Sequence, residues 1–280
     1  MLNWKKSINL FTKDCLNTDL LKLIKKSGFC GIDMGYDYDF FTDKAWKDKI
    51  YQIKENLDAN GLECAQVHLP CYRNLFTSSD IIIEKIENDI LLSFSTMPIL
   101  GVKWGALHPR TAMDFGCDVE RSRHDNKERI KVYLEEASKY NVGIAIENIP
   151  VFPDCSQYKF FTSNPDDHCE LIDSFNSPLV GACWDIGHSN LMPYNQAEVI
   201  RQMGNRIKIT HTHNNTTMCD LHICPAIGHI KWNEVIPALA DTGFEGPLNL
   251  ELNLNLIMPA LLEDYLIFNS KAADELLKMA

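Results

Sequence analysis

The sequence lacks the features that would indicate a secreted, membrane-spanning or disulfide-stabilised protein. Its ten cysteines are spread along the chain and contain no CxxC pair. No apolar run is long enough to cross a bilayer, and the first residues show no charged segment followed by an apolar stretch and a cleavage site. We therefore expect a cytoplasmic protein without a membrane partner, whose cysteines are small buried side chains.

The chain also has little positive charge. It contains 27 Lys and Arg against 38 Asp and Glu, a formal net charge of −11, and few lysine- or arginine-rich loops. Proteins that bind nucleic acid usually present a basic face, so the composition argues against nucleic acid as a partner. A cleft lined with carboxylates would instead attract cations.

What the sequence does contain is a regular alternation of strand-like and helical segments. Eight short apolar or β-branched runs have the length of buried strands, at residues 7–11, 31–34, 63–68, 102–108, 142–147, 179–185, 206–211 and 247–251. Eight strands that alternate with helices form a parallel sheet with right-handed crossovers, which most simply closes into a barrel. The predicted fold class is therefore α/β, a (β/α)8 TIM barrel, with residues 1–280 as a single domain.

Helix start and stop signals separate the strands. Thr18 is the predicted N-cap of a helix over 19–26, and further helices are predicted after Thr42, over 80–100, after Asn164, over 196–203 and over 234–241. An open doubly wound sheet is the main alternative to a barrel. Such a sheet usually has a glycine-rich turn after its first strand, and residues 7–13 contain no glycine.

Seven of the eight predicted strands contain a polar residue at or near their C-terminal end. These residues are Asp33, His68, His108, Glu147, Asp185, His211 and Glu251. In a (β/α)8 barrel the C-terminal ends of the strands converge on one mouth, which is where active sites lie. The sequence therefore predicts that these seven side chains meet.

Strand parity places four of these residues inside the barrel. Glu147 shares its face with Ala145, whereas the isoleucines on either side of Ala145 face the helices. The same parity applies to Asp185, His211 and Glu251. Three buried carboxylates and an imidazole repel one another unless a cation compensates them. The mixed oxygen and nitrogen donors suit one divalent ion, Mn, Mg, Co or Zn.

The stretch from 205 to 251 has the most specific pattern. It contains His211 after a strand, Asp220-Leu-His222, a turn with Pro225 and Gly228, Trp232, Gly243-Phe-Glu-Gly246, and a strand that ends in Glu251. This order and spacing resemble the xylose isomerase-like TIM barrels, a superfamily of sugar isomerases and epimerases that also contains endonuclease IV. Gly28-Phe-Cys-Gly-Ile-Asp33, Ile146-Glu147-Asn148 and Asp185-Ile-Gly-His188 match further signatures, so the resemblance covers nearly the whole chain.

In the isomerase and epimerase branch, the resemblance implies one divalent metal ion that holds adjacent oxygens of a sugar or sugar phosphate. The implied metal ligands are Glu147, Asp185, His211 and Glu251. Glu147 and Glu251 would also be the catalytic pair that moves a proton through an enediolate. The implied substrate-binding residues are His188, His68, His108, Asp33, Asp220 and His222. A small sugar is the expected partner, a homo-oligomer is compatible with the sequence, and a metal-assisted dehydratase of an inosose-type substrate is an alternative.

Two positions depart from the epimerase pattern. Asp33 stands where the family has a longer Glu, which puts its substrate contact in question. The stretch 214–219 lacks the arginine that many epimerases have after the seventh strand. No glycine-rich phosphate loop is present either, so the motifs give a phosphorylated substrate little support.

The endonuclease IV branch is the main rival interpretation. There the resemblance implies three zinc ions, bound by the same four residues together with two early histidines, an Asp-x-x-His and an Asp-x-His. The chain has candidates at all these positions: His68, His108, His188, Asp220 and His222. Such an enzyme would be a phosphodiesterase acting on abasic DNA, which the acidic composition disfavours. A third class is a sugar-binding barrel that keeps the metal without catalysis.

One basic patch stands close to a predicted strand end, at His108-Pro-Arg110 and Arg121-Ser-Arg123. Its two interpretations are a solvated loop and a site that binds a sugar acid or a phosphate.

Overall fold

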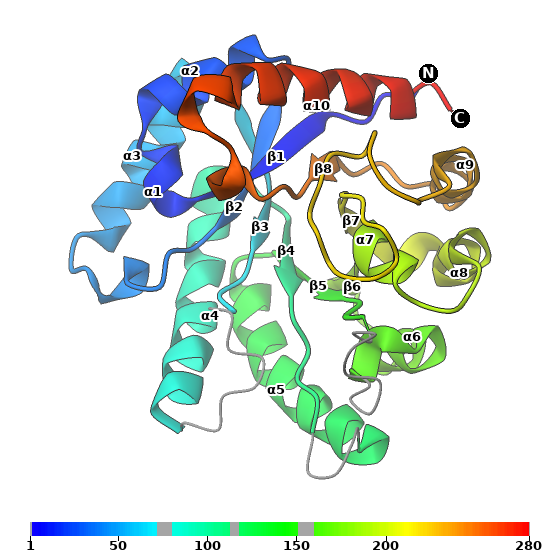
Figure 1. Ribbon diagram of the computed structural model, residues 1–280. Helices are drawn as coiled ribbons and strands as arrows, with labels where there is room; N and C mark the ends of the chain where they lie inside the picture. The colour runs from blue at the N-terminus through cyan, green and yellow to red at the C-terminus, as the bar shows by residue number, and fades with distance from the viewer. Residues whose placement is uncertain (1, 72–79, 113–117, 151–159, 280) are drawn as a thin grey trace.

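The computed structural model describes residues 2–71, 80–112, 118–150 and 160–279. Eight parallel strands form the wall of a nearly closed barrel, and helices surround it (Figure 1). The strands are β1 (Lys6–Phe11), β2 (Gly31–Gly35), β3 (Glu63–His68), β4 (Trp104–Leu107), β5 (Gly143–Glu147), β6 (Val180–Asp185), β7 (Ile207–His211) and β8 (Leu248–Leu250). The predicted (β/α)8 TIM barrel is confirmed.

The helices lie outside the ring of strands, in the order that the alternating pattern predicts (Figure 1). They are α1 (Thr12–Cys15), α2 (Thr18–Lys26), α3 (Trp46–Ala59), α4 (Asp80–Leu100), α5 (Val119–Lys139), α6 (Pro165–Asp173), α7 (Ile186–Asn190), α8 (Gln196–Met203), α9 (Trp232–Asp241) and α10 (Leu262–Leu276). No helix in the described part of the chain is long and apolar enough to cross a membrane.

Two local expectations need correction. The N-cap of α2 is Asn17 rather than Thr18, because the Asn17 side chain accepts hydrogen bonds from the amides of Asp19 and Leu20. Of the eight described cysteines, Cys30 and Cys219 are exposed and Cys71 and Cys169 are half-buried, so the expectation that the cysteines are buried holds for the other four only.

The barrel closes through a weak junction between β7 and β8, where few main-chain hydrogen bonds join the described residues. Neighbouring strands pair in the order β7-β6-β5-β4-β3-β2-β1-β8. Between β7 and β8, the described residues show a single isolated bridge, from Thr212 to Leu250. The Thr212 amide donates to the carbonyl of Asn249 at 2.8 Å, and the Glu251 amide donates to the carbonyl of Thr212 at 3.1 Å. Few main-chain bonds therefore close the ring where two of the predicted metal ligands stand.

The interior of the barrel has an apolar half and a polar half. Ala106, Ala145, Cys183 and Ile209 form a small buried cluster of their own, separate from the large apolar layer between sheet and helices. Strand parity is thereby confirmed for β5, β6 and β7. Across the barrel, β1, β2, β3 and β8 contribute the buried polar residues Ser7, Asp33, Gln66 and Asn249. The small side chains leave room for the polar groups at the mouth.

His168 of α6 supports β5 from outside the barrel. The ring is fully buried, and its Nε2 lies 2.9 Å from the carbonyl oxygen of Ile146. Burial lowers the pKa of His168 from 6.5 to about 4. The unfolded chain therefore binds a proton more readily than the folded one. The stability that neutral His168 contributes is fully present above pH 6.5 and is lost as the pH falls through about 4.

We expect His168→Gln to flatten the loss of stability between pH 7 and pH 4 by up to about 3 kcal/mol, since one pKa unit corresponds to about 1.4 kcal/mol. The measurement is urea unfolding at a series of pH values. The control is His124→Gln, because His124 is an exposed residue of α5. Parallel pH profiles for the wild type and His168→Gln would refute this assignment.

Candidate metal centre

Four consecutive strands bring the predicted metal ligands together at the C-terminal mouth. Glu147 ends β5, Asp185 ends β6, His211 ends β7, and Glu251 directly follows β8. Glu147, Asp185 and His211 are at most 1% exposed. The side chain of Glu251 is 17% exposed and is the most accessible of the four. The centre is therefore nearly closed from solvent, with Glu251 at its open side.

The three carboxylates of this set surround the Nδ1 atom of the fourth member, His211. This atom lies 3.4 Å from Oε2 of Glu147, 3.4 Å from Oε2 of Glu251 and 3.9 Å from Oδ2 of Asp185. Among the described residues, His211 Nδ1 and both of these glutamate oxygens have no hydrogen-bond partner. Buried polar atoms are rarely left without a partner unless an ion or a water binds them. The donor set and its unsatisfied atoms therefore fit one divalent ion.

Asp33 lies beneath this centre rather than at its surface. Its side chain is 2% exposed, and Oδ2 lies 3.2 Å from Nε2 of His211. The same oxygen accepts hydrogen bonds from Nε2 of Gln66 at 2.9 Å and from Nδ2 of Asn249 at 2.8 Å. A carboxylate on the outer nitrogen of a histidine orients the ring and directs its other nitrogen at a metal. The position of Asp33 thus suits support of His211 rather than the predicted contact with substrate.

We expect Asp33→Asn to weaken divalent-ion affinity about 10- to 100-fold, the range typical for loss of such an outer partner. The amide of Asn lacks the negative charge, and its own N–H group would face the N–H donors of Gln66 and Asn249, which now bond to Asp33. Calorimetric titration with Mn²⁺ measures the effect. Asp37→Asn is the control, because Asp37 bonds Thr12 and the Lys13 amide instead of a predicted ligand. Equal affinities of wild type and Asp33→Asn would show that His211 needs no such support.

A second group of candidate ligands adjoins the first through Glu147. Oε2 of Glu147 lies 3.2 Å from Nε2 of His108 and 3.7 Å from Nε2 of His68. The two Nε2 atoms of His68 and His108 are 3.1 Å apart. Cys71 offers a sulfur atom within 4.8 Å of a ring nitrogen of each histidine. His68 and His108 thus lie beside Glu147, which is also a member of the quartet of predicted metal ligands, Glu147, Asp185, His211 and Glu251.

A third group stands on the other side of Glu147. Oε1 of Glu147 lies 3.3 Å from Nδ1 of His188, and Nε2 of His188 lies 3.3 Å from Oδ2 of Asp220. The same Asp220 oxygen lies 2.9 Å from Nε2 of His222. Burial lowers the pKa of His222, but Glu251 and Asp220 raise it, to about 9. All ten predicted site residues therefore belong to one continuous cluster.

His222 has an unusual backbone. Its φ angle is +47°, in the left-handed region that non-glycine residues seldom adopt. Its Nδ1 lies 3.6 Å from Oε2 of Glu251. Residues held in this conformation concentrate at functional sites, where the surrounding structure enforces them.

The sequence analysis missed two candidate ligands of the cluster, Cys71 and His213. His213 is the more deeply buried of the two. It is fully buried, and its Nε2 lies 3.1 Å from Oδ1 of Asp185. Its ring stacks on that of His222 with centroids 4.0 Å apart. One residue, Thr212, lies between His211 and His213, so the alternation of side chains could have placed both histidines on the inner face. The pattern Thr-His-Thr-His was the available signal.

Carboxylates and imidazoles compensate one another in this cluster. Burial raises the pKa of Glu147, but His108 and His211 lower it, and the net result lies well below the usual range. Burial lowers the pKa of His211, whereas Cys183, Glu251 and Glu147 raise it well above the usual range. Protons on the rings thus balance charged carboxylates. A divalent cation could replace those protons, because metal binding requires deprotonated ligands.

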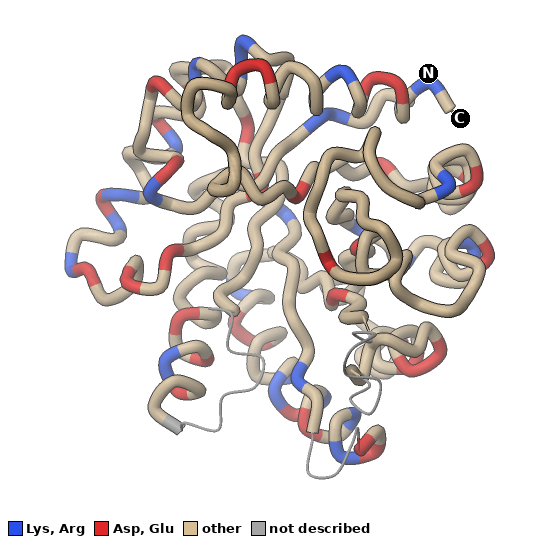
Figure 2. The backbone as a smooth tube through the Cα atoms, in the orientation of Figure 1, with Lys and Arg blue, Asp and Glu red and all other residues tan. Residues whose placement is uncertain are grey.

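Charge is unevenly placed around the barrel. Lys and Arg lie largely on the surrounding helices, and several acidic segments lie inside the ring (Figure 2). This arrangement favours a cation at the mouth.

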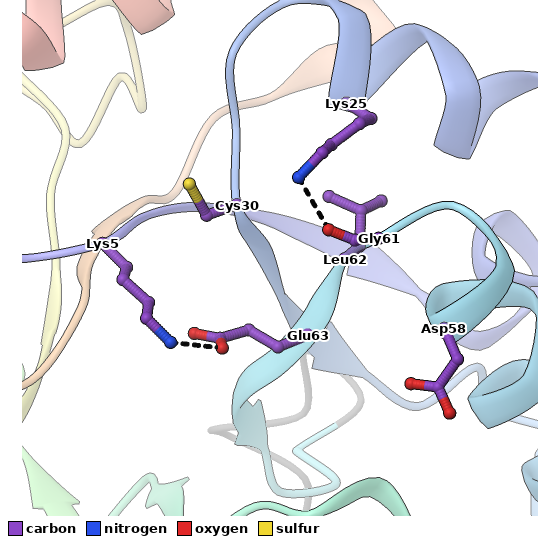
Figure 3. A pocket seen from close by; sticks show the side chains of 7 residues that line it. All are labelled: Lys5, Lys25, Cys30, Asp58, Gly61, Leu62 and Glu63. Atoms are coloured by element: carbon purple, nitrogen blue, oxygen red, sulfur yellow. Dashed lines mark hydrogen bonds and ion pairs between the residues drawn. The ribbon is translucent and has the colours of Figure 1, made fainter.

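The opposite end of the barrel has a separate hollow, next to the N-terminal ends of β1, β2 and β3 (Figure 3). Its charged groups pair with their neighbours: Lys5 Nζ lies 2.6 Å from Glu63 Oε2, and Lys25 Nζ donates to the carbonyl of Gly61 at 2.7 Å. Polar residues at this end of a (β/α)8 barrel usually serve stability. We assign no site there.

The family follows from a match that spans most of this barrel. The family described as "Xylose isomerase-like TIM barrel" matches residues 21–264. The chain belongs to this family. The resemblance inferred from the strand-end residues is thereby confirmed.

Solved structures of similar fold include proteins named as sugar epimerases. A D-tagatose 3-epimerase-like protein is 19% identical with a TM-score of 0.78, and 98% of this chain and 97% of that chain align. D-psicose 3-epimerase in the presence of D-fructose is 14% identical with a TM-score of 0.76, covering 98% and 99%. The IOLI protein with a bound zinc atom is 18% identical with a TM-score of 0.72, covering 97% and 96%. At these identities the likeness shows the shared fold.

The curated relatives match over shorter stretches. Uncharacterized protein MJ1311 of Methanocaldococcus jannaschii is 28% identical over 158 residues, 54% of this chain and 52% of that protein. Uncharacterized protein y4fM of Sinorhizobium fredii is 33% identical over 84 residues, 30% of this chain and 27% of that protein. The chain thus matches about half or less of the length of these relatives, neither of which has a named activity.

Proposed function

We propose that this protein is a divalent-metal-dependent isomerase or epimerase of a small sugar. The main support is the placement of two carboxylates, Glu147 and Glu251, each 3.4 Å from the same ring nitrogen of His211. They come from strands three positions apart in the barrel and therefore flank one small volume. Membership of the xylose isomerase-like family and the fold of named epimerases agree with this activity.

A divalent ion held by the quartet would act as a Lewis acid that polarises a sugar carbonyl and its neighbouring hydroxyl. The chain itself supplies the proton chemistry. Glu147 is nearly inaccessible to water and is held by several imidazoles, whereas Glu251 is partly exposed at the open side. One carboxylate would remove the proton next to the carbonyl, and the other would return a proton from its own side. His188 is positioned to donate to a sugar oxygen through its Nε2.

Solvent exchange tests this proposal directly. The metal-loaded protein is incubated in D₂O with a panel of ketohexoses, aldoses and inososes together with sugar phosphates and sugar acids, and deuterium at the carbon next to the carbonyl is measured by NMR. Incorporation that disappears on chelation supports the proposal. An absence of exchange into every sugar of the panel would count against it. Loss of water without exchange back into substrate would indicate a dehydratase with the same ligands.

A second candidate function has a specific observation in its favour. His68, His188 and His222 each have Nδ1 at 2.9–3.2 Å from a main-chain carbonyl oxygen, which leaves Nε2 facing the carboxylates. A neutral ring that donates its Nδ1–H to such a carbonyl has its Nε2 available as a metal ligand. The second and third groups are thus prepared as ligands for further ions. A three-zinc phosphodiesterase would need such groups.

The number of ions per chain separates the two candidates. The proposed sugar reaction uses one ion per chain, and His68 is not among its predicted ligands. We therefore expect His68→Ala to keep the wild-type metal content and to raise KM with little change in kcat. Elemental analysis of dialysed protein gives the metal content, and initial rates give KM. His229→Ala is the control, because His229 is an exposed residue outside the cluster. Three zinc ions in the wild type and two in His68→Ala would favour the phosphodiesterase.

A further inference from the structure

Helix α5 has a polar stripe on its buried face. Ser122, Asn126, Arg129 and Tyr133 follow the i, i+4, i+7, i+11 spacing of one helix face, and Ser122, Asn126 and Tyr133 are at most 1% exposed. The inward face of a barrel helix is normally apolar. Buried polar groups cost free energy unless they are hydrogen-bonded, so this stripe calls for a specific purpose.

The stripe holds the chain that leaves β4. The Asn126 side chain accepts a hydrogen bond from the amide of Arg110 at 2.9 Å and donates to the carbonyl of Arg110 at 2.6 Å. The Ser122 hydroxyl accepts from the amide of Ala112 at 2.9 Å. The backbone at Arg110 and Ala112 is therefore fixed by hydrogen bonds to side chains of α5, which disfavours a freely solvated loop, one of the two interpretations of this basic patch.

Two guanidinium groups share one carboxylate at this place. Glu87 of α4 accepts hydrogen bonds from Arg110 and from Tyr133, and its Oε1 lies 3.2 Å from Nε of Arg129. In the described part of the chain, no other carboxylate lies within 4.0 Å of either guanidinium. Burial and Arg129 lower the pKa of Arg110, against the effect of Glu87. Among the described residues, one positive charge is thus left without a neutralising carboxylate.

A pocket opens on these two arginines. Arg110, Arg129, Thr111 and His108 line it, with isoleucines of α4 on the other wall. Its described lining contains no Asp or Glu, and Glu87, which contacts both arginines, is not among the lining residues. The pocket shares His108 with the metal centre, where His108 Nε2 lies 3.2 Å from Oε2 of Glu147. A molecule in the pocket therefore adjoins the candidate ligands.

We infer that this pocket is a subsite for the oxyanion group of the substrate, a phosphoryl or carboxylate group, whose sugar end lies at the metal centre. Only the placement of the sugar end at the metal centre rests on the proposed function; binding of the oxyanion in the pocket does not. Arginine binds both kinds of oxyanion through paired N–H groups, and a hydroxyl such as that of Thr111 can donate a further bond. Substrates would then be sugar phosphates or sugar acids rather than neutral sugars.

The test measures binding of simple anions to the metal-loaded protein. Inorganic phosphate and acetate are titrated separately by calorimetry into the wild type, Arg110→Gln and Arg110→Lys. We expect Arg110→Gln to lose about tenfold or more in affinity for the preferred anion and Arg110→Lys to lose less, since lysine keeps the charge but not the fork. Arg201→Gln is the control, because Arg201 pairs with Asp241 on another face and should leave binding unchanged.

The outcomes are separable. Tighter binding of phosphate supports a phosphoryl group, and tighter binding of acetate supports a carboxylate. Wild-type affinity in Arg110→Gln would overturn the inference, because the anion would then bind at the metal alone. So would an absence of binding of both anions. Metal content and melting temperature of each variant show that the barrel is intact, and Arg110→Lys remains informative if Arg110→Gln does not fold. Arg110-dependent binding without deuterium exchange into any sugar would reject the proposed function and keep the subsite.

Discussion

Glu251→Gln is expected to weaken the affinity for the divalent ion by more than the roughly 10- to 100-fold that loss of an outer partner causes. Proton exchange into the substrate should fall by a further factor of about 10² to 10⁴, the usual contribution of a positioned acid or base. Oε2 of Glu251 lies 3.4 Å from His211 Nδ1 and has no hydrogen-bond partner in the described part of the chain. The amide has the same shape but lacks the charge that a cation requires.

Mn²⁺ titration and NMR exchange rates at saturating metal separate the two effects. Glu245→Gln is the matched control, because Glu245 precedes β8 and is exposed. If Glu251→Gln bound metal as the wild type does and lost only exchange, Glu251 would be a proton carrier outside the metal shell. If both properties survived, the quartet itself would be wrong.

Gly187→Ala should destabilise the protein by about 1–3 kcal/mol, the typical cost of overpacking. A Cβ atom on Gly187 would stand 1.9 Å from the ring of His213, far inside any real contact. The ring cannot yield easily, since it is fully buried and stacked on His222. Displacement of His213 would also disturb Asp185, so we expect weaker metal binding as well.

A compensating pair makes this prediction specific. Gly187→Ala combined with His213→Ala removes the ring that the new methyl group meets. Stability by urea unfolding should therefore recover partly in the double variant relative to Gly187→Ala, while metal affinity should not recover. Additive losses in the double variant would mean that Gly187 matters for another reason.

The quartet was predictable because it depends on local rules. Side-chain alternation and the convergence of strand ends need no knowledge of distant contacts, and they placed Glu147 and its three companions correctly at one mouth. The role of Asp33 was not predictable in this way. Its partners Gln66, His211 and Asn249 are 33, 178 and 216 residues away along the chain, and only the closed barrel brings them together.

Helices α5 and α10 were not predicted, for a physical reason. The buried face of α5 includes Ser122 and Asn126, and that of α10 includes Asn269 and Ser270. Polar residues on a buried face weaken the apolar period by which an amphipathic helix is found in a sequence. The same property that hid α5 is the one that fixes the backbone at Arg110.

Because the junction between β7 and β8 is weak, a metal ion bound at the mouth would also affect the closure of the barrel. His211 and Glu251 lie on the two sides of this junction, where the described main chain supplies a single bridge made of two hydrogen bonds. An ion bound by both side chains would cross-link the first and last members of the strand order. Occupancy of the site and closure of the ring would then be a single linked equilibrium, in which the ligand stabilises the closed form by mass action. The barrel would be held shut at its loosest place by the ion that it binds.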